Sequence, residues 1–296
     1  MIMDKIHIPV LLEESIKALN VEPSGFYIDC TLGDGGHSNK ILSQLSSQGL
    51  LLSIDRDQNA IDFVKGYYEI PPNWILVKSN FSQVKEVLDS NKIEKQPNGI
   101  LMDLGLSSRQ LEKSNDRGFS YQEEAESLDM RMDTDLAVSA LDLLKVLNEH
   151  ELSKLFKLYG EEKRSKAIAK VIKENISEIK TVGDLKSLIY KVVPVASNNR
   201  NPSRRVFQAL RIAVNDELNS LKDGLDSAFE VLSADGRLVV IAFHSLEDRI
   251  IKDFFNEKEL KEEGKILSRK PITPSEDELQ NNPRSSSAKL RFLRKV

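Results

Sequence analysis

The stretch Tyr27-Ile-Asp-Cys-Thr-Leu-Gly-Asp-Gly-Gly-His-Ser38 decides the fold of this chain. An apolar strand runs into Asp29, and a glycine loop follows before the polar start of a helix. Glycine tolerates positive φ angles and lets a ligand approach the backbone closely, as a turn between strand and helix around a nucleotide requires. The stretch therefore predicts the first βα unit of a parallel sheet, with a nucleotide-binding loop at Gly33, Gly35 and Gly36.

A second apolar run, Leu50-Leu-Leu-Ser-Ile54, ends at Asp55, which lies 22 residues after Gly33 (55 − 33 = 22). An acid about 20 residues after the glycine loop is the group that binds ribose hydroxyls in nucleotide-binding sheets. The spacing predicts an adenosine-containing cofactor at the carboxyl edge of the sheet.

Two cofactors fit this pattern, a nicotinamide dinucleotide and S-adenosylmethionine. A dinucleotide favours the spacing G-x-G-x-x-G, because its pyrophosphate faces a helix N-terminus. The loop here reads G-x-G-G-H-S, with the acid Asp29 upstream. S-adenosylmethionine carries an ammonium and a sulfonium, which a nearby carboxylate attracts. The order of acid and glycines thus favours the methyl donor, while a tight turn in another doubly wound protein stays an alternative.

Strands and helices alternate over the first hundred residues, which predicts a doubly wound Rossmann-like α/β sheet. The predicted strands lie near 26–31, 50–54, 75–78 and 99–104, with helices near 36–45, 58–68 and 81–90. From 109 to 215 only helical patterns occur, near 139–147, 149–158, 164–175, 182–193 and 203–214. A helix over 216–232 and strands at 237–243 and 289–296 then complete the sheet. We predict one domain formed by residues 1–108 and 216–296, with an all-α insertion at 109–215.

Composition sets wide limits on the class of protein. The chain has 296 residues, 40% of them hydrophobic and 30% charged, as is typical of a globular protein. No apolar run approaches the length of about 20 residues that spans a bilayer, and the N-terminus has no signal-peptide pattern. The single cysteine, Cys30, excludes an intramolecular disulfide and fits a reducing cytoplasm. The four histidines lie far apart in the sequence, so no metal site is expected.

Two segments that follow predicted strands carry residues suited to catalysis. Asp103 ends the fourth strand, where it could orient an amine, although a helix-capping loop is the alternative. His244 and Ser245 follow the fifth strand, where histidine could transfer a proton or contact a phosphate. The alternative there is a helix start with Ser245 as N-cap and Asp248 at N3.

Cys30 bears on the type of reaction. Methylation at a pyrimidine carbon needs a thiol nucleophile, and Cys30 lies in a strand end that is expected to pack in the core. Transfer to an exocyclic amine needs only alignment and a proton acceptor. The sequence therefore favours nitrogen over carbon as the methyl acceptor.

The net charge of −4 gives no sign of nucleic-acid binding, but local basic clusters occur. Each cluster taken alone is better explained by a solvated face of a helix or strand. The clusters comprise Lys163, Arg164, Lys166, Lys170 and Lys173; Arg200, Arg204, Arg205 and Arg211; and Lys289, Arg291, Arg294 and Lys295.

These segments together resemble the MraW/RsmH methyltransferase family, over the whole chain and with the insertion included. The matching stretches are His7-x-Pro-Val-Leu-Leu-x-Glu14, Asp29-x-Thr-x-Gly-x-Gly-Gly-His-Ser38, Asp55-Arg-Asp57, Asn80-Phe81, Asp103-Leu-Gly-x-Ser-Ser-x-Gln110, Arg117-Gly-Phe-Ser120, Leu128-Asp-Met-Arg-Met-Asp133, Tyr159-Gly-Glu-Glu162, Arg205-x-Phe-Gln-Ala-Leu-Arg-Ile-x-Val-Asn215, Phe243–Arg249 and Asn282-Pro-Arg-Ser285.

The resemblance implies a class I methyltransferase that uses S-adenosylmethionine to methylate the N4 amine of a decoding-centre cytosine in 16S ribosomal RNA. The substrate would be an assembled small ribosomal subunit, and the insertion would recognise the RNA. A homodimer stays open. The implied cofactor contacts are Gly35, Gly36, His37, Asp55, Phe81, Asp103 and Gln110, beside Asp29 and Gly33 from the loop pattern; Arg200, Arg204, Arg205 and Arg211 would bind RNA.

Two other functions stay open at this point. One is a nicotinamide-dependent oxidoreductase, since the glycine loop and Asp55 suit a dinucleotide as well. The other is a ribosome-assembly factor whose cofactor has no catalytic role. The catalytic roles of Asp103, His244 and Ser245 are hypotheses from their places at the strand ends.

Overall fold

The chain forms two compact units in a computed structural model that describes residues 9–112, 116–193 and 201–296. The first unit comprises Met1–Leu106 and Leu218–Val296, and the second comprises Ser107–Glu217. Asp103 therefore lies in the first unit and Gln110 in the second. Within the described residues, no helix combines the length and the apolar character needed to cross a membrane.

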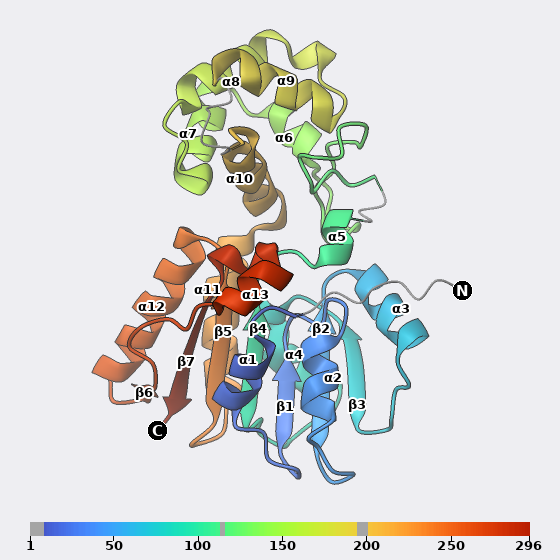
Figure 1. Ribbon diagram of the computed structural model, residues 1–296, viewed down its shortest axis with the longest axis vertical. Helices are drawn as coiled ribbons and strands as arrows, with labels where there is room; N and C mark the ends of the chain where they lie inside the picture. Colours follow the sequence, from blue (N-terminus) through green and yellow to red (C-terminus); the bar gives the residue numbers. More distant parts are fainter. Residues whose placement is uncertain (1–8, 113–115, 194–200) are drawn as a thin grey trace. The chain divides into compact units, whose positions relative to one another are not determined.

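The first unit is built on a seven-stranded sheet in the order β3-β2-β1-β4-β5-β7-β6 (Figure 1). The first five strands are parallel, and β7 pairs antiparallel with both β5 and β6. This order confirms the predicted doubly wound α/β fold. The short β6 was not predicted, because three residues are too few to show a pattern. The strands are β1 (Phe26–Asp29), β2 (Leu50–Asp55), β3 (Trp74–Lys78), β4 (Gly99–Asp103), β5 (Arg237–Ala242), β6 (Gly264–Ile266) and β7 (Lys289–Lys295).

Helices cover both faces of this sheet because consecutive strand residues point to opposite faces. Tyr27 and Leu51 pack in one core with α1 (Leu12–Leu19), α2 (Gly36–Leu42) and α3 (Gln58–Tyr67). Phe26 and Leu52 pack in the other core with α4 (Val84–Ser90), α11 (Glu217–Val231) and α12 (Ser245–Leu260). The parallel strands are consequently apolar throughout, and their polar residues gather at the carboxyl ends. Three short helices complete this unit: η1 (Phe81–Gln83), α13 (Glu276–Asn281) and η3 (Pro283–Ser287).

The second unit is helical, and side chains fix where several of its helices begin. Capping boxes start α6, α7 and α9, among them that of Thr181 and Asp184 at the start of α9. Gly160 lies against the first turn of α10, since a Cβ atom there would lie 2.5 Å from the carbonyl oxygen of Arg205. The helices are α5 (Ser108–Glu112), α6 (Ala140–Val146), α7 (Glu149–Gly160), α8 (Ser165–Glu174), η2 (Ile176–Glu178), α9 (Val182–Val192) and α10 (Ser203–Asn215).

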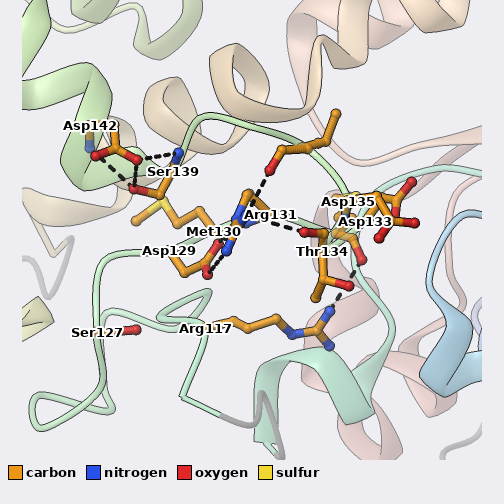
Figure 2. A network of polar contacts seen from close by, with 12 residues as sticks. Arg117, Ser127, Asp129, Met130, Arg131, Asp133, Thr134, Asp135, Ser139 and Asp142 are labelled. Atoms are coloured by element: carbon orange, nitrogen blue, oxygen red, sulfur yellow. Dashed lines mark hydrogen bonds and ion pairs between the residues drawn. The ribbon is translucent and has the colours of Figure 1, made fainter.

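A segment without regular secondary structure, residues 116–139, is held in this unit by polar contacts (Figure 2). The Arg131 guanidinium donates to both carboxylate oxygens of Asp129 (2.7 and 2.8 Å) and to the carbonyls of Thr134 and Leu136. Although burial opposes ionisation, these hydrogen bonds lower the pKa of Asp129. Asn215 binds the backbone of the same segment from α10, accepting from Met132 N–H and donating to the Met130 carbonyl. The Leu128–Asp133 motif is thus the scaffold of the segment.

Candidate functional site

The glycine loop between β1 and α2 has the conformation that the sequence predicted. Gly33 and Gly35 have positive φ angles of 51° and 80°. Gly36 has no room for a side chain, because a Cβ atom would lie 2.2 Å from Cγ of Pro9. The loop therefore requires glycine at these positions, for its backbone conformation and for its close packing on Pro9.

Asp29, expected to attract a cationic ligand, is fully buried and held by the chain itself. Its carboxylate accepts hydrogen bonds from the Ser38 hydroxyl (2.6 Å) and from Thr31 N–H (3.1 Å). Ser38 also contacts the Ser53 hydroxyl at 2.7 Å, and Trp74 donates to Ser53 at 2.9 Å. Desolvation raises the pKa of Asp29 despite these hydrogen bonds. Asp29 thus fixes the start of α2 and the loop in place.

Asp55, the last residue of β2, binds the glycine loop that follows β1. Its Oδ2 accepts from Gly33 N–H and its Oδ1 from Asp57 N–H, each at 2.8 Å. Desolvation raises the pKa of Asp55 to about 6. Each carboxylate oxygen keeps a second lone pair, so the group can position the loop and still accept from a ligand hydroxyl.

His37, in the first turn of α2, faces Asp103 at the end of β4. His37 Nε2 lies 3.1 Å from the Val10 carbonyl, so this nitrogen carries the ring proton and donates it. Desolvation lowers the pKa of His37 to about 4, so the ring is neutral at pH 7. Its Nδ1 therefore presents a lone pair to Oδ2 of Asp103, 3.6 Å away.

Asp103 is the carboxylate at this edge that the chain leaves partly unsatisfied. Its Oδ1 is buried without a hydrogen-bond partner among the described residues. Its backbone N–H donates to the Thr31 hydroxyl at 2.7 Å, which ties it to the Asp29 network. Desolvation, with Asp29 and Glu247 nearby, raises the pKa of Asp103 well above its usual range. Two acceptors, Asp103 and His37, thus face one another and need a proton or an N–H donor between them.

Phe81 begins η1, directly after β3. Asn80 caps this turn by accepting from Ser82 N–H at 3.1 Å. The Phe81 ring lies against Gly224 of α11, where a Cβ atom would come within 2.5 Å of it. The Arg56 guanidinium lies 5.6 Å from the ring centroid. The ring is thereby fixed at the same edge of the sheet as Asp55.

The predicted start of α12 is one residue off. His244, and not Ser245, is the N-cap, and Glu247, and not Asp248, closes the capping box. Glu247 N–H donates to His244 Nδ1 at 3.3 Å, so the ring proton is on Nε2, 3.1 Å from Glu247 Oε1. His244 Nδ1 is thereby engaged, Nε2 is buried without a hydrogen bond among the described residues, and Ser245 is exposed. Asp248 instead pairs with Lys289 and Arg291 of β7.

The other predicted contacts lie in the second unit. Gln110 of α5 is buried, and its Oε1 accepts from Ser107 N–H at 3.0 Å. Arg204 and Arg205 are exposed on the first turn of α10. Arg211 makes a bidentate pair with Glu217, at 2.7 and 2.8 Å, which identifies a structural role. Arg200 lies outside the described residues.

Sequence reasoning missed the residues that hold His37 from the other side. Val10 supplies the carbonyl that His37 binds, and Leu11, with a φ of 52°, turns the chain directly after it. Leu11 N–H donates to Glu278 Oε1 at 2.8 Å, which ties this turn to α13. The only signal was the motif around Pro9, which no local pattern connects with the glycine loop.

Comparison with known proteins places the chain in a family. The model of the MraW methylase family matches residues 4–296. Ribosomal RNA small subunit methyltransferase H of Caldicellulosiruptor bescii is 45% identical, with 98% of this chain and 99% of that protein covered. Proteins of the same name from Clostridium botulinum and Fusobacterium nucleatum are 44% and 42% identical, with 99% of this chain covered in each case and 100% and 99% of those proteins.

Among solved structures, a candidate rRNA methylase from Clostridium thermocellum superposes with a TM-score of 0.50 at 11% identity. The superposition covers 98% of this chain and 100% of that one. At so low an identity the likeness shows the fold alone, and it confirms the predicted sheet class.

Proposed function

This chain belongs to the MraW methylase family, and we propose that it methylates the N4 amine of a cytosine in 16S ribosomal RNA, with the small ribosomal subunit as substrate. The enzyme class is that of an S-adenosylmethionine-dependent methyltransferase, as expected from the loop and the two acids. The oxidoreductase and the non-catalytic assembly factor find no support in a family of methylases. A ribosomal substrate makes the cytoplasm the place of action.

The edge of the sheet fits the cofactor. The glycine loop packs closely on Pro9, Val64 and Tyr68 and carries no side chain at Gly35 and Gly36, while Asp55 keeps lone pairs for ribose hydroxyls. Phe81 offers a fixed aromatic ring beside Asp55 for a purine. When bound, S-adenosylmethionine supplies a methyl group activated by its sulfonium.

The observation that carries the proposal is the facing pair of acceptors, Asp103 and His37. A buried oxygen without a donor destabilises the unliganded site, and an N–H donor removes that cost. An ammonium or an exocyclic amine is such a donor. The pair therefore favours an amine-bearing ligand or substrate over a hydroxyl, which can donate only one hydrogen bond.

Asp103 is the residue we assign to the amine. The lone pair of an exocyclic amine is delocalised into the pyrimidine ring, so attack requires the N–H bonds to rotate out of the ring plane or a proton to leave. A carboxylate that accepts one N–H in a buried site does both: it orients the amine and takes up developing positive charge. Desolvation raises the pKa of Asp103, which increases the affinity of its carboxylate for a proton.

The test uses small subunits that lack the modification and a donor with a tritiated methyl group. We expect label in 16S ribosomal RNA, recovered as N4-methylated cytosine after nuclease digestion and mass analysis. Label at a ring carbon, or none, would overturn the proposal.

The Asp103→Asn variant separates two roles for this residue. If Asp103 orients the amine, kcat falls and the Kd for S-adenosylhomocysteine, measured by calorimetry, stays the same. If Asp103 binds only the cofactor, the Kd rises and kcat at saturating cofactor is retained.

A further inference from the structure

A hollow of about 340 Å³ lies in the second unit where α7 ends and α8 begins. Its lining residues are Lys157, Glu161, Glu162, Lys163, Ser165 and Lys166. Three of the six are lysines, and none is aromatic. The hollow therefore offers charge, and no surface on which a base could stack.

The three lysines have no partner within the part of the chain that the structure describes: no ion pair or hydrogen bond engages Lys157, Lys163 or Lys166. Elsewhere in this unit lysines are used, as Lys186 pairs with Glu124 and Lys173 binds the carbonyls at the end of α6. Unpaired ammonium groups that converge on one hollow repel each other, and an anion removes that repulsion.

The two acids of the hollow offset only part of this charge. Glu162 is buried, and its Oε1 accepts from Arg164 N–H at 2.8 Å while its Oε2 lies 3.8 Å from the Arg205 guanidinium. Glu161 is the one exposed acid of the lining. The contact between Glu162 and Arg205 also brings the first turn of α10, with the exposed Arg204, to the rim of the hollow.

We propose that this lysine hollow is a docking site for the phosphodiester backbone of the RNA substrate. The inference rests on the proposed function, which supplies RNA as the substrate. The hollow is large enough to admit a backbone phosphate, and the exposed Arg204 and Arg205 extend the positive surface next to it. Contacts of this kind position the nucleic acid without reading its sequence. The first turn of α8 adds to the attraction, since it carries neither a side-chain cap nor an acid.

The test compares two double variants of equal charge. K163Q/K166Q neutralises the hollow, and K145Q/K180Q removes two exposed lysines elsewhere in the same unit. For K163Q/K166Q we expect the KM for unmodified small subunits to rise about tenfold, with kcat within about twofold of wild type. The slope of log Kd against log salt for deproteinised 16S ribosomal RNA should fall by about 1 to 2. K145Q/K180Q should change neither quantity, and both variants should keep the wild-type Tm and Kd for S-adenosylhomocysteine.

The outcomes separate this inference from the proposed function. If the wild-type enzyme places no label in ribosomal RNA, the proposed function fails whatever the lysines do. If it does, but K163Q/K166Q has an unchanged KM, or K145Q/K180Q shows an equal rise, the docking site is overturned. A rise in KM for subunits with unchanged binding of deproteinised RNA would mean that the hollow contacts a ribosomal protein, which also overturns the inference.

Discussion

The carboxyl edge of the sheet and the lysine hollow use charge in opposite ways. At the sheet edge, Asp29 is fully buried and Asp103 is partly buried, and desolvation raises the pKa of both. In the hollow, lysines stand exposed, and the lining contains no buried cation. A buried charge interacts strongly with what it touches, because little water screens it. An exposed charge acts weakly, over a longer range and in a salt-dependent way. We therefore assign chemistry to the first region and docking to the second.

At the sheet edge, the protein supplies hydrogen-bond donors to the carboxylate of Asp29 but not to Oδ1 of Asp103. Three protein donors, counting the long contact from the Thr31 hydroxyl, bind Asp29, whereas Oδ1 of Asp103 has none among the described residues. The first acid is thus expected to matter for folding and the second for turnover.

The largest effect is expected for Asp103→Asn. We expect kcat to fall about a thousandfold, since removal of one buried group that stabilises developing charge costs about that much. The free energy of unfolding should not fall, because no protein donor loses its acceptor. Initial rates at saturating cofactor and urea unfolding measure the two quantities. Asp89→Asn, a change of equal charge on the exposed end of α4, serves as control. If Asp103→Asn lowered the free energy of unfolding, Asp103 would have a structural role like that of Asp29, and the distinction between the two acids would be wrong.

Asp29→Ala should give the reverse result for stability. Ser38 and Thr31 would lose their acceptor in the core, so we expect the free energy of unfolding to fall by about 3 kcal/mol. Urea unfolding checks the change, and Asp29→Asn should recover part of it by keeping one acceptor oxygen. An unchanged midpoint for Asp29→Ala would contradict the structural role.

The sequence could predict the sheet because its signals are local. Each signal lies within a few residues of the feature that it predicts: the apolar strands that alternate with helices, the glycine loop, and the acid Asp55. The contact of Val10 with His37 was out of reach, because it joins positions 27 residues apart through a backbone carbonyl. The N-cap at His244 was missed for another reason: histidine is rare in that position, and Ser245 beside it is the more common cap. The lysine hollow was visible only as a basic run, since its shape depends on how α7 meets α8.

The stability of the sheet edge should depend on pH through His37. The pKa of His37 is about 4 in the folded chain and about 6.5 in the unfolded chain, so the unfolded state binds more protons between these values. The stability that His37 contributes is therefore present above pH 6.5 and is lost as the pH falls towards 4. The raised pKa of Asp55 acts in the opposite direction. Because the folded state holds the Asp55 proton more tightly than the unfolded state does, the folded protein loses stability as the pH rises through this range.

Comparison with His37→Gln isolates the histidine, because Asp55 is common to both proteins. The difference in unfolding free energy between wild type and variant should grow by about 2 kcal/mol from pH 4.5 to pH 7. Urea unfolding at these two pH values measures it. A difference that is constant with pH would show that His37 titrates normally in the folded chain.

The smallest effects are expected for two arginines of α10, one of which is largely buried and the other exposed. Arg211 pairs with Glu217, with side chains only 16% and 9% exposed, whereas Arg205 is about half exposed. Arg211→Gln should lower the free energy of unfolding by about 1.5 kcal/mol, because it leaves a shielded carboxylate without its donors.

Arg205→Gln should leave stability unchanged and raise the KM for small subunits by about threefold, as the loss of one screened phosphate contact would. Thermal unfolding and steady-state rates at two salt concentrations separate the two outcomes. Since screening weakens only the exposed contact, the effect of Arg205→Gln on KM should shrink as salt rises, while the stability loss in Arg211→Gln should change little.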